Sequence, residues 1–219
     1  MPSDLMDNQS NLLKQIMEDM NSKNSLKRAK AIKLLGQMEL SIHDISLNLH
    51  SKLEDALFDS ESKVRREAVM TLAFIEGTVA IPLLEPLLND PVLSVRSKAI
   101  AAISFAGGTP SDSLVCKLIE FLNDPTPEIR DRSARALGRL HAFQAKKKLI
   151  ELAKSDKSPV VRTGAVVGLG LLNDEDSSLK STLCHLLKSE TSNSVISAIN
   201  EVLATMKNSV GVTNDLKKE

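Results

Sequence analysis

Apolar residues recur along most of the chain at the spacing of an amphipathic α-helix, and the same order of apolar and polar positions returns about every 33 residues. In each copy an aliphatic segment leads to an aspartate, and an arginine follows six residues later. The four pairs are Asp59 and Arg65, Asp90 and Arg96, Asp124 and Arg130, and Asp156 and Arg162. Successive arginines are 31, 34 and 32 residues apart, which suits two helices of about 10 to 14 residues and their turns.

The segment after each arginine follows one template, in which a small residue is followed by aliphatic residues at helical spacing. Its copies are Ala68-Val69-x-x-Leu72, Ala99-Ile100-x-x-Ile103, Ser133-Ala134-x-x-Leu137 and Ala165-Val166-x-x-Leu169. The segment before each aspartate also carries apolar residues at helical spacing. These segments are 53–58, 81–88, 114–122 and 149–153. Each repeat is therefore predicted to be a pair of helices.

Weaker copies flank the four clear ones. Arg28 precedes Ala31 and Ile32 in the first, whereas Val195 takes the arginine position in the last. Terminal repeats are expected to diverge because one of their faces meets water. We predict an all-α fold, an α-solenoid of about five to six stacked antiparallel helix pairs, as a single domain. The expected repeats are 12–46, 47–78, 79–110, 111–143, 144–175 and 176–206, between an N-terminal extension 1–11 and a polar C-terminal tail 207–219.

The aspartate, often followed by proline, is expected to stop the first helix and to cap or neutralise the start of the second. The arginine can donate to turn carbonyls, or to the acidic residue of its own or the adjacent repeat. We therefore assign these residues to a structural ladder. Its members are Asp59, Arg65, Asp90, Arg96, Asp124, Arg130, Asp156 and Arg162.

Composition changes this picture in four ways. Aromatic residues are only 2% of a chain that is 42% hydrophobic, so the core is predicted to be aliphatic. The 28 basic and 28 acidic residues cancel, so no global field favours nucleic acid or anionic lipid. The acidic start of the chain, and apolar runs that look shorter than about 18 residues, suggest a cytoplasmic protein without a membrane partner. Cys116 and Cys184 are interpreted as buried free thiols.

Catalytic and metal-binding patterns are not evident. No serine or cysteine is accompanied by a recognisable base and orienting acid, and His43, His50, His141 and His185 lack ligand spacing. The glycines in 164–170 lie inside a second helix, where close helix packing explains them better than a nucleotide loop. Gly107-Gly108 is interpreted as a turn between repeats. We expect no catalytic residue, no metal and no cofactor, and thus not an enzyme.

The run Leu87-Leu88-Asn89-Asp90-Pro91-x3-Val95-Arg96-x2-Ala99, with its near copies, resembles the HEAT-repeat family, especially the short repeats of phycobilin lyase subunits. The resemblance spans roughly 12 to 205. It implies second helices that line a concave face, and roles that differ widely among members. Deoxyhypusine hydroxylases, a HEAT-like family of iron enzymes, take ligands from His-Glu dipeptides, which this sequence does not contain.

On that implied face we expect an apolar patch beside a positive cluster, the residue types that protein interfaces favour. The candidates are Arg66, Met70, Phe74, Lys98, Phe105, Arg132, Arg135 and Arg139. A bland interpretation stays open, in which the phenylalanines close gaps between repeats and neighbouring carboxylates balance the arginines.

The first hypothesis is a non-catalytic protein–protein interaction scaffold whose partner contributes an acidic or amphipathic segment. The alternative, implied by the resemblance, is a phycobilin lyase-like or phycobilisome-degradation protein. Such a protein would bind a bilin near Phe74, Phe105, Arg132 and Arg135, and a bilin lyase would be the first enzyme to consider. Nucleic-acid binding is the least favoured hypothesis, since the chain has no Trp or Tyr.

Overall fold

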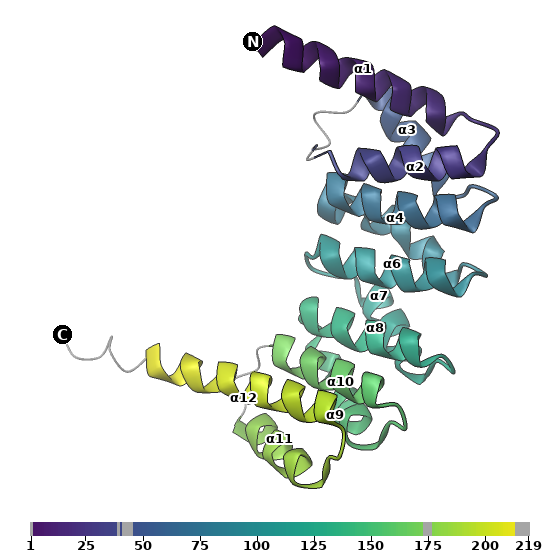
Figure 1. The fold of residues 1–219 in the computed structure, drawn as a ribbon. Helices are drawn as coiled ribbons and strands as arrows, with labels where there is room; N and C mark the ends of the chain where they lie inside the picture. The colour runs from purple at the N-terminus through teal and green to yellow at the C-terminus, as the bar shows by residue number, and fades with distance from the viewer. Residues whose placement is uncertain (1, 39, 41–45, 173–176, 213–219) are drawn as a thin grey trace. The chain divides into compact units, whose positions relative to one another are not determined.

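The structure is a computed structural model of the 219-residue chain, and it describes residues 2–38, 40, 46–172 and 177–212. In these residues every regular element is a helix, which confirms the predicted all-α helical-repeat fold (Figure 1). The contacts divide the chain into two compact units, 1–108 and 109–219. Whether they make one domain stays a prediction.

Unit 1 contains three successive helix pairs. They are α1 (Pro2–Met20) with α2 (Ser25–Gly36), α3 (Leu47–Ala56) with α4 (Ser62–Glu76), and the short run η2 (Gly77–Ala80), α5 (Ile81–Leu84) and η3 (Glu85–Asn89) with α6 (Leu93–Ala106). The second helices α2, α4 and α6 lie side by side as one layer of the unit (Figure 1).

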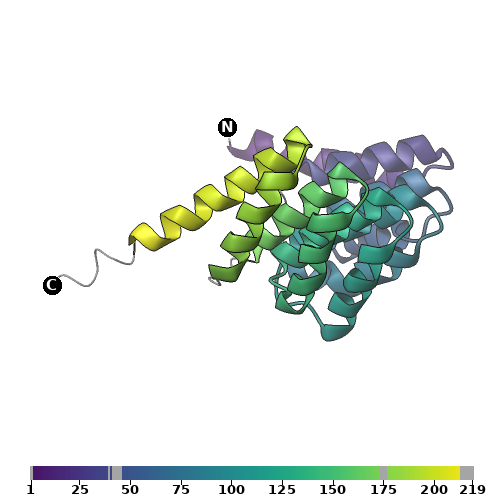
Figure 2. The same ribbon diagram turned by 90° about the horizontal axis from the view of Figure 1, so that it is seen from below.

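Unit 2 also contains three pairs. They are α7 (Asp112–Glu120) and η4 (Phe121–Asn123) with α8 (Pro127–Arg139), η5 (Phe143–Ala145) and α9 (Lys146–Ser155) with α10 (Pro159–Leu171), and α11 (Ser177–Ser189) with α12 (Asn193–Val212). Helix α10 packs between α8 and α12. At 20 residues, α12 extends beyond its 13-residue neighbour α10 (Figure 2).

The ends of the chain differ from the expected layout. The residues assigned to an N-terminal extension are helical from Pro2, because α1 starts there. Residues 207–212 of the expected tail continue α12, and 213–219 lie outside the described residues.

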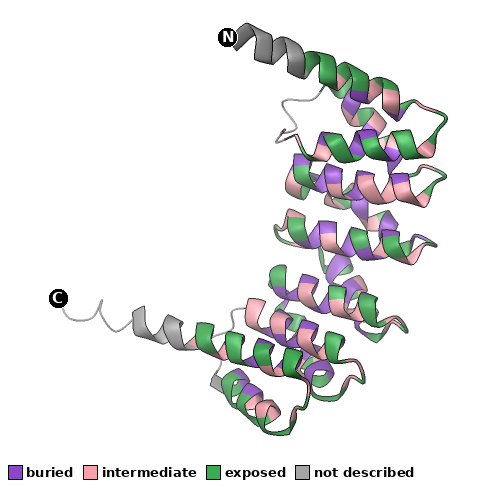
Figure 3. Cartoon of the chain, in the orientation of Figure 1, coloured by how far each residue is buried: buried purple, intermediate pink, exposed green. Residues whose placement is uncertain are grey.

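The core of each unit is aliphatic, as predicted from the composition. The template positions Val64, Ala68 and Leu72 are fully buried, and so are their counterparts in the other clear repeats (Figure 3). All five phenylalanines keep part of their surface exposed. Small and medium side chains thus fill the space between helices, as close helix packing requires.

The first helix of the third pair is broken into short pieces. The sequence predicts one helical segment over 81–88, but Pro82 and Pro86 each lack the N–H that an uninterrupted helix uses. The chain there alternates between α and 3₁₀ turns while Leu84, Leu87 and Leu88 still reach the core.

The stretch Ser62–Asn89 is long enough to cross a membrane, and an 18-residue window within it is apolar enough, with a mean hydropathy of 1.6. The sequence analysis did not recognise it. Half of this window is buried inside the fold. Gly77 ends α4 within the stretch at a φ of 57°, a conformation that glycine adopts without strain. Packing in the core of unit 1 therefore accounts for the apolar character.

The prediction that both cysteines are buried is wrong, because Cys116 and Cys184 are exposed. Each follows a residue that points into the core, Val115 and Leu183. A step of about 100° around the helix turns the next side chain away from the core. A cysteine with apolar neighbours in the sequence is therefore not necessarily buried.

Glycines bring α8 and α10 close together, as the sequence analysis favoured. A Cβ atom on Gly138 would meet the backbone of Gly168, and one on Gly168 would meet the carbonyl of Ala134. A Cβ on Gly164 would meet the side chain of Asp131. Gly107 and Gly108 form a turn at positive φ after α6, also as expected.

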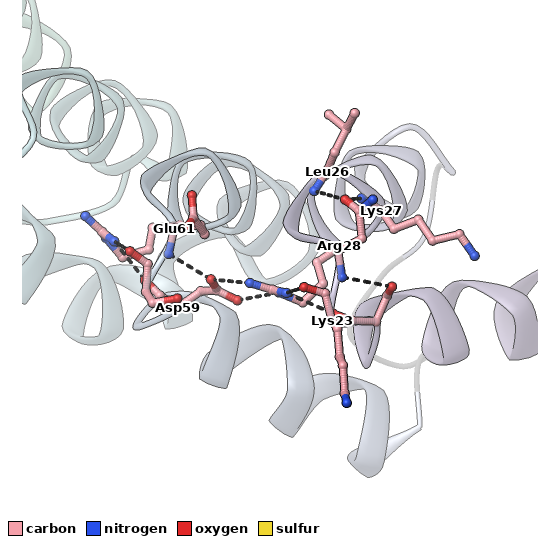
Figure 4. A network of polar contacts seen from close by, with 10 residues as sticks. Lys23, Leu26, Lys27, Arg28, Asp59 and Glu61 are labelled. Atoms are coloured by element: carbon pink, nitrogen blue, oxygen red, sulfur yellow. Dashed lines mark hydrogen bonds and ion pairs between the residues drawn. The ribbon is translucent and has the colours of Figure 1, made fainter.

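In unit 1 the arginines connect successive repeats. Nε and Nη2 of Arg28 donate to the two carboxylate oxygens of Asp59 at 2.7 and 2.8 Å, while Nη1 donates to the carbonyls of Ser22 and Lys23 (Figure 4). Arg65 repeats this fork on Asp90, at 2.7 and 2.9 Å. One guanidinium thus holds the turn before its own helix and the acidic turn of the next repeat.

Unit 2 uses the same device twice. Arg130 forks onto Asp156 at 2.8 and 2.9 Å, and Arg162 onto Glu190 at 2.8 and 2.7 Å. Arg96, in the last pair of unit 1, donates from Nη1 to two carbonyls of its own turn, as Arg28, Arg65 and Arg130 do. The sequence analysis missed Arg28 and Glu190 as ladder residues, because they lie in the degenerate terminal repeats.

Each ladder aspartate also shapes its own turn. Oδ1 of Asp59 accepts the N–H of Glu61, and Asp90, Asp124 and Asp156 do the same two residues on. The acceptor therefore lies before the N-cap residue and does not cap the helix itself, which refines the expectation. Burial by itself would raise the pKa of Asp59, but the Arg28 fork and the Glu61 N–H outweigh it and lower that pKa.

We expect Gly168→Ala to lower the free energy of unfolding by about 1–3 kcal/mol, because the new methyl group overlaps the backbone of α8. Gly170→Ala is the matched control. Its Cβ would meet the side chain of Val202, with Cγ2 at 2.6 Å, and no helix backbone, so the cost should be smaller, and alanine favours the helix by about 1 kcal/mol. Urea unfolding followed by circular dichroism measures both, and equal effects would contradict this packing.

Glu190→Gln should cost about 2–3 kcal/mol of stability at neutral pH, since it removes the charge that Arg162 binds. The Arg162 hydrogen bonds, opposed by burial and helped by the N–H groups of Ser192 and Thr191, lower the pKa of Glu190 from 4.5 to about 2. The stabilisation is complete above pH 4.5 and is lost as pH falls toward 2.

The stability difference between wild type and Glu190→Gln should therefore shrink as unfolding is measured at successively lower pH. Glu151→Gln is the control, because Glu151 pairs with Lys148 on the surface and should contribute less than about 1 kcal/mol. A Glu190 difference that does not change with pH would refute this account.

Candidate protein-binding surfaces

The predicted surface residues divide between the two units. Those on α4 and α6 lie in unit 1 and are Arg66, Met70, Phe74, Lys98 and Phe105. Those on α8 lie in unit 2 and are Arg132, Arg135 and Arg139. The two phenylalanines and the three α8 arginines therefore belong to different units, and whether they form the single surface expected stays a prediction.

In unit 1 two phenylalanines form an exposed aromatic pair. The rings of Phe74 and Phe105 meet edge to face with 4.6 Å between their centroids and 68° between their planes. Phe74 remains 50% exposed and Phe105 49% exposed. One side of each ring packs between α4 and α6, and the other side meets solvent. The interpretation that the phenylalanines close gaps between repeats therefore accounts for the packed side of each ring and not for the exposed side.

Around this pair, apolar and basic side chains share the layer of second helices. Met70 lies one turn before Phe74 on α4 and is half-buried. Nearer the start of the helices, Lys98 is exposed and Arg66 lies 3.1 Å from Glu67. We name Met70, Phe74, Lys98 and Phe105 the aromatic patch.

In unit 2 the arginines of α8 differ in their pairing. Nε of Arg135 donates to Oδ1 of Asp131 at 2.8 Å, one turn earlier. Arg132 and Arg139 are exposed, and across the described ranges of the chain no carboxylate pairs with either. The interpretation that neighbouring carboxylates balance these arginines therefore holds for Arg135 alone.

Some positions on the second helices near these residues are buried. Ser97 is 4% exposed, and Gly164 is buried against Asp131. Both belong to the row of positions that faces the neighbouring second helix, which sequence periodicity alone does not separate from the solvent-facing row.

A family model of HEAT repeats matches residues 10–104 and 115–204. The chain belongs to the HEAT-repeat family. No curated protein matches it. Solved structures with a similar fold include an engineered protein, with 18% identity, coverage of 90% of this chain and 96% of that one, and a TM-score of 0.55.

Two natural proteins share the HEAT-like fold at similar distance. The Escherichia coli protein YibA has 20% identity over 89% of this chain and 82% of its own, with a TM-score of 0.54. The CpcE–CpcF complex of phycocyanin lyase from Nostoc sp. PCC7120 has 17% identity over the same shares, with a TM-score of 0.51. These likenesses show the fold alone.

One polar cluster in this HEAT-repeat chain escaped the sequence analysis. Glu76, the last residue of α4, is almost fully buried and contacts Nε2 of His50 on α3, whose Nδ1 lies 3.7 Å from Glu54. The only sequence signal for this cluster is that Glu54 follows His50 by four residues, which is about one helical turn. Among the described residues, no group of three or more acidic, histidine or cysteine side chains is arranged to hold a metal ion.

The cluster is held at an energetic cost. Burial raises the pKa of Glu76, the positive charge available on His50 opposes that rise, and the Glu54 carboxylate adds to it. A carboxyl whose pKa is raised by folding destabilises the fold when it is ionised, and the penalty disappears as pH falls below the folded-state value.

We expect Glu76→Gln to raise the free energy of unfolding by about 1–2 kcal/mol at neutral pH, since the amide removes a buried charge yet can still accept a bond from His50. The gain should fall as the wild-type carboxyl becomes protonated at lower pH. Urea unfolding of both proteins between neutral and mildly acidic pH measures it. A loss of stability at neutral pH would show that the ion pair outweighs burial.

Proposed function

We propose that this HEAT-repeat protein is a non-catalytic scaffold that binds a partner protein on the exposed faces of its second helices. The half-exposed Phe74–Phe105 pair carries the proposal. Both phenylalanines lie on the layer of second helices, although the core of the fold is built without fully buried aromatic rings. Within each unit this layer presents a continuous surface, because α4 lies between α2 and α6 in unit 1 and α10 lies between α8 and α12 in unit 2.

The energetics favour a contact at this pair. Completing the burial of two half-exposed phenylalanines would contribute about 1 kcal/mol each from apolar area. Aromatic side chains at the centre of an interface often contribute more, because they lose little conformational freedom on binding. Two rigid rings that already touch need little reordering, which lowers the entropic cost of association.

The charges around the pair favour one kind of partner. Lys98 is exposed about two turns before Phe105 on the same helix, so an apolar partner segment that carries acidic residues fits this surface. The proposal that the chain has no activity of its own rests on the sequence, in which no nucleophile has a recognisable base and orienting acid.

The alternative is a protein that acts on a phycobiliprotein or its bilin, and it is supported by the fold shared with a phycocyanin lyase. It is the weaker proposal. The likeness to that lyase, at 17% identity, shows the fold alone. A shift in visible absorption when free bilin is added would favour the alternative over the scaffold.

We expect the double substitution Phe74→Ser and Phe105→Ser to weaken partner binding at least about tenfold, because it removes the apolar anchors. The measurement is quantitative mass spectrometry of proteins captured by each immobilised variant, followed by titration with the purified candidate partner. Phe58→Ser is the control, because Phe58 is 65% exposed in the turn after α3, away from the aromatic patch.

Circular dichroism first establishes that both variants fold. A captured protein that is lost with the double substitution and kept with Phe58→Ser supports the scaffold. If every captured protein binds both variants equally, the aromatic patch is not the binding surface.

A further inference from the structure

Unit 2 carries two exposed arginines in a protein with no net charge. Arg132 and Arg139 lie on α8, and within the part of the chain that the structure describes neither has an acidic partner. By contrast, the ladder arginines of this unit, Arg130 and Arg162, each donate from both Nε and Nη2 to a carboxylate. The two exposed guanidinium groups are therefore available to a ligand.

Their spacing defines what such a ligand must offer. Arg132 and Arg139 are seven residues apart, which places them on one side of α8 at a distance of about 10 Å along its axis. Arg135 lies between them, with its Nε bound to Asp131. The ligand must therefore present two negative charges about two helical turns apart.

The neighbouring helix adds an apolar wall. The glycine contacts of Gly138 and Gly168 bring α8 and α10 together, and the repeat register places Val167 beside Arg135 and Leu171 beside Arg139. Val167 and Leu171 are partly exposed. We name Arg132, Arg139, Val167 and Leu171 the α8–α10 strip.

This combination fits an acidic helix better than a nucleic acid. The α8–α10 strip contains no aromatic side chain on which a base could stack, and its partly exposed Val167 and Leu171 suit aliphatic side chains better than a phosphate backbone. An α-helix laid along α8 has the same rise per residue, so carboxylates at positions i and i+7 can meet both arginines. Aliphatic residues between them would cover Val167 and Leu171.

We propose that the α8–α10 strip is a second docking site, which binds an acidic α-helical segment of a partner protein. Carboxylates seven residues apart pair with Arg132 and Arg139, and one or two aliphatic side chains between them pack on Val167 and Leu171. The proposal rests on the proposed scaffold function and adds a site, in a different unit from the aromatic patch, with its own ligand chemistry.

The probe is a fluorescein-labelled synthetic helical peptide with glutamates at positions i and i+7 and leucines at i+3 and i+4, titrated by fluorescence anisotropy with the full chain. Arg132→Glu combined with Arg139→Glu should weaken its binding at least about tenfold, since two charge-assisted contacts become repulsive. The same variant should gain affinity for a peptide in which lysines replace both glutamates. This reversal is the expected signature of direct pairing.

The matched control is Lys147→Glu combined with Lys154→Glu, which changes two exposed lysines on α9 and alters the net charge equally. It should leave affinity for the glutamate peptide within about twofold. Equal weakening by both double variants would overturn the site, because it would show attraction by overall charge. Unchanged affinity after Leu→Ser substitution in the peptide would overturn the apolar contact.

Two further arms separate the remaining outcomes. Tighter binding of a single-stranded oligonucleotide than of the peptide, with the same dependence on both arginines, would overturn the choice of a protein ligand. Phe74→Ser combined with Phe105→Ser should not change peptide affinity, which supports a separate site. If the peptide fails to bind while those phenylalanine substitutions still abolish partner capture, this inference falls and the proposed function stands.

Discussion

The fold depends on one repeated interaction, in which a single guanidinium group binds two turns at once. In unit 1, Arg28 and Arg65 each donate to carbonyls before their own helix and to both oxygens of the next repeat's aspartate. Arginine suits this role because its donors form a rigid fork and its charge is never lost. A helix pair cannot bury its apolar face alone, so an interaction that joins each pair to the next is what makes stacking specific.

Once the stacking is fixed, the size of the side chains between neighbouring second helices sets the distance between those helices. Gly138 and Gly168 let α8 and α10 approach until backbone meets backbone, whereas in unit 1 the half-buried rings of Phe74 and Phe105 lie between α4 and α6. One repeat template therefore yields local surfaces of different character. The surface around Phe74 and Phe105 is apolar, whereas the α8–α10 strip is basic with an aliphatic wall. This difference supports a different ligand chemistry for each surface.

Buried carboxylates affect the stability of this fold in two different ways. The carboxylates of Asp59 and Glu190 are held in their ionised form by guanidinium and N–H donors, so they stabilise the fold wherever they are charged. Glu76 contacts His50 but also feels the Glu54 carboxylate, and it lies at the C-terminal end of α4, where the helix dipole disfavours a negative charge. The first arrangement contributes to stability, whereas the second opposes it.

The sequence by itself determined the helix pairs, the aliphatic core and most ladder residues, because these follow from periodicity and from a six-residue spacing that recurs. It misjudged the cysteines and missed Glu190, since a side chain's direction around a helix and a partner in a divergent repeat are not written in local composition. Only the tertiary structure decided which surface residues lie together. The phenylalanines touch because α4 and α6 are adjacent, Arg135 is paired while Arg132 is not, and His50 meets Glu76 across two helices. Contacts between residues distant in sequence depend on how helices pack, and that packing is a property of the assembled fold.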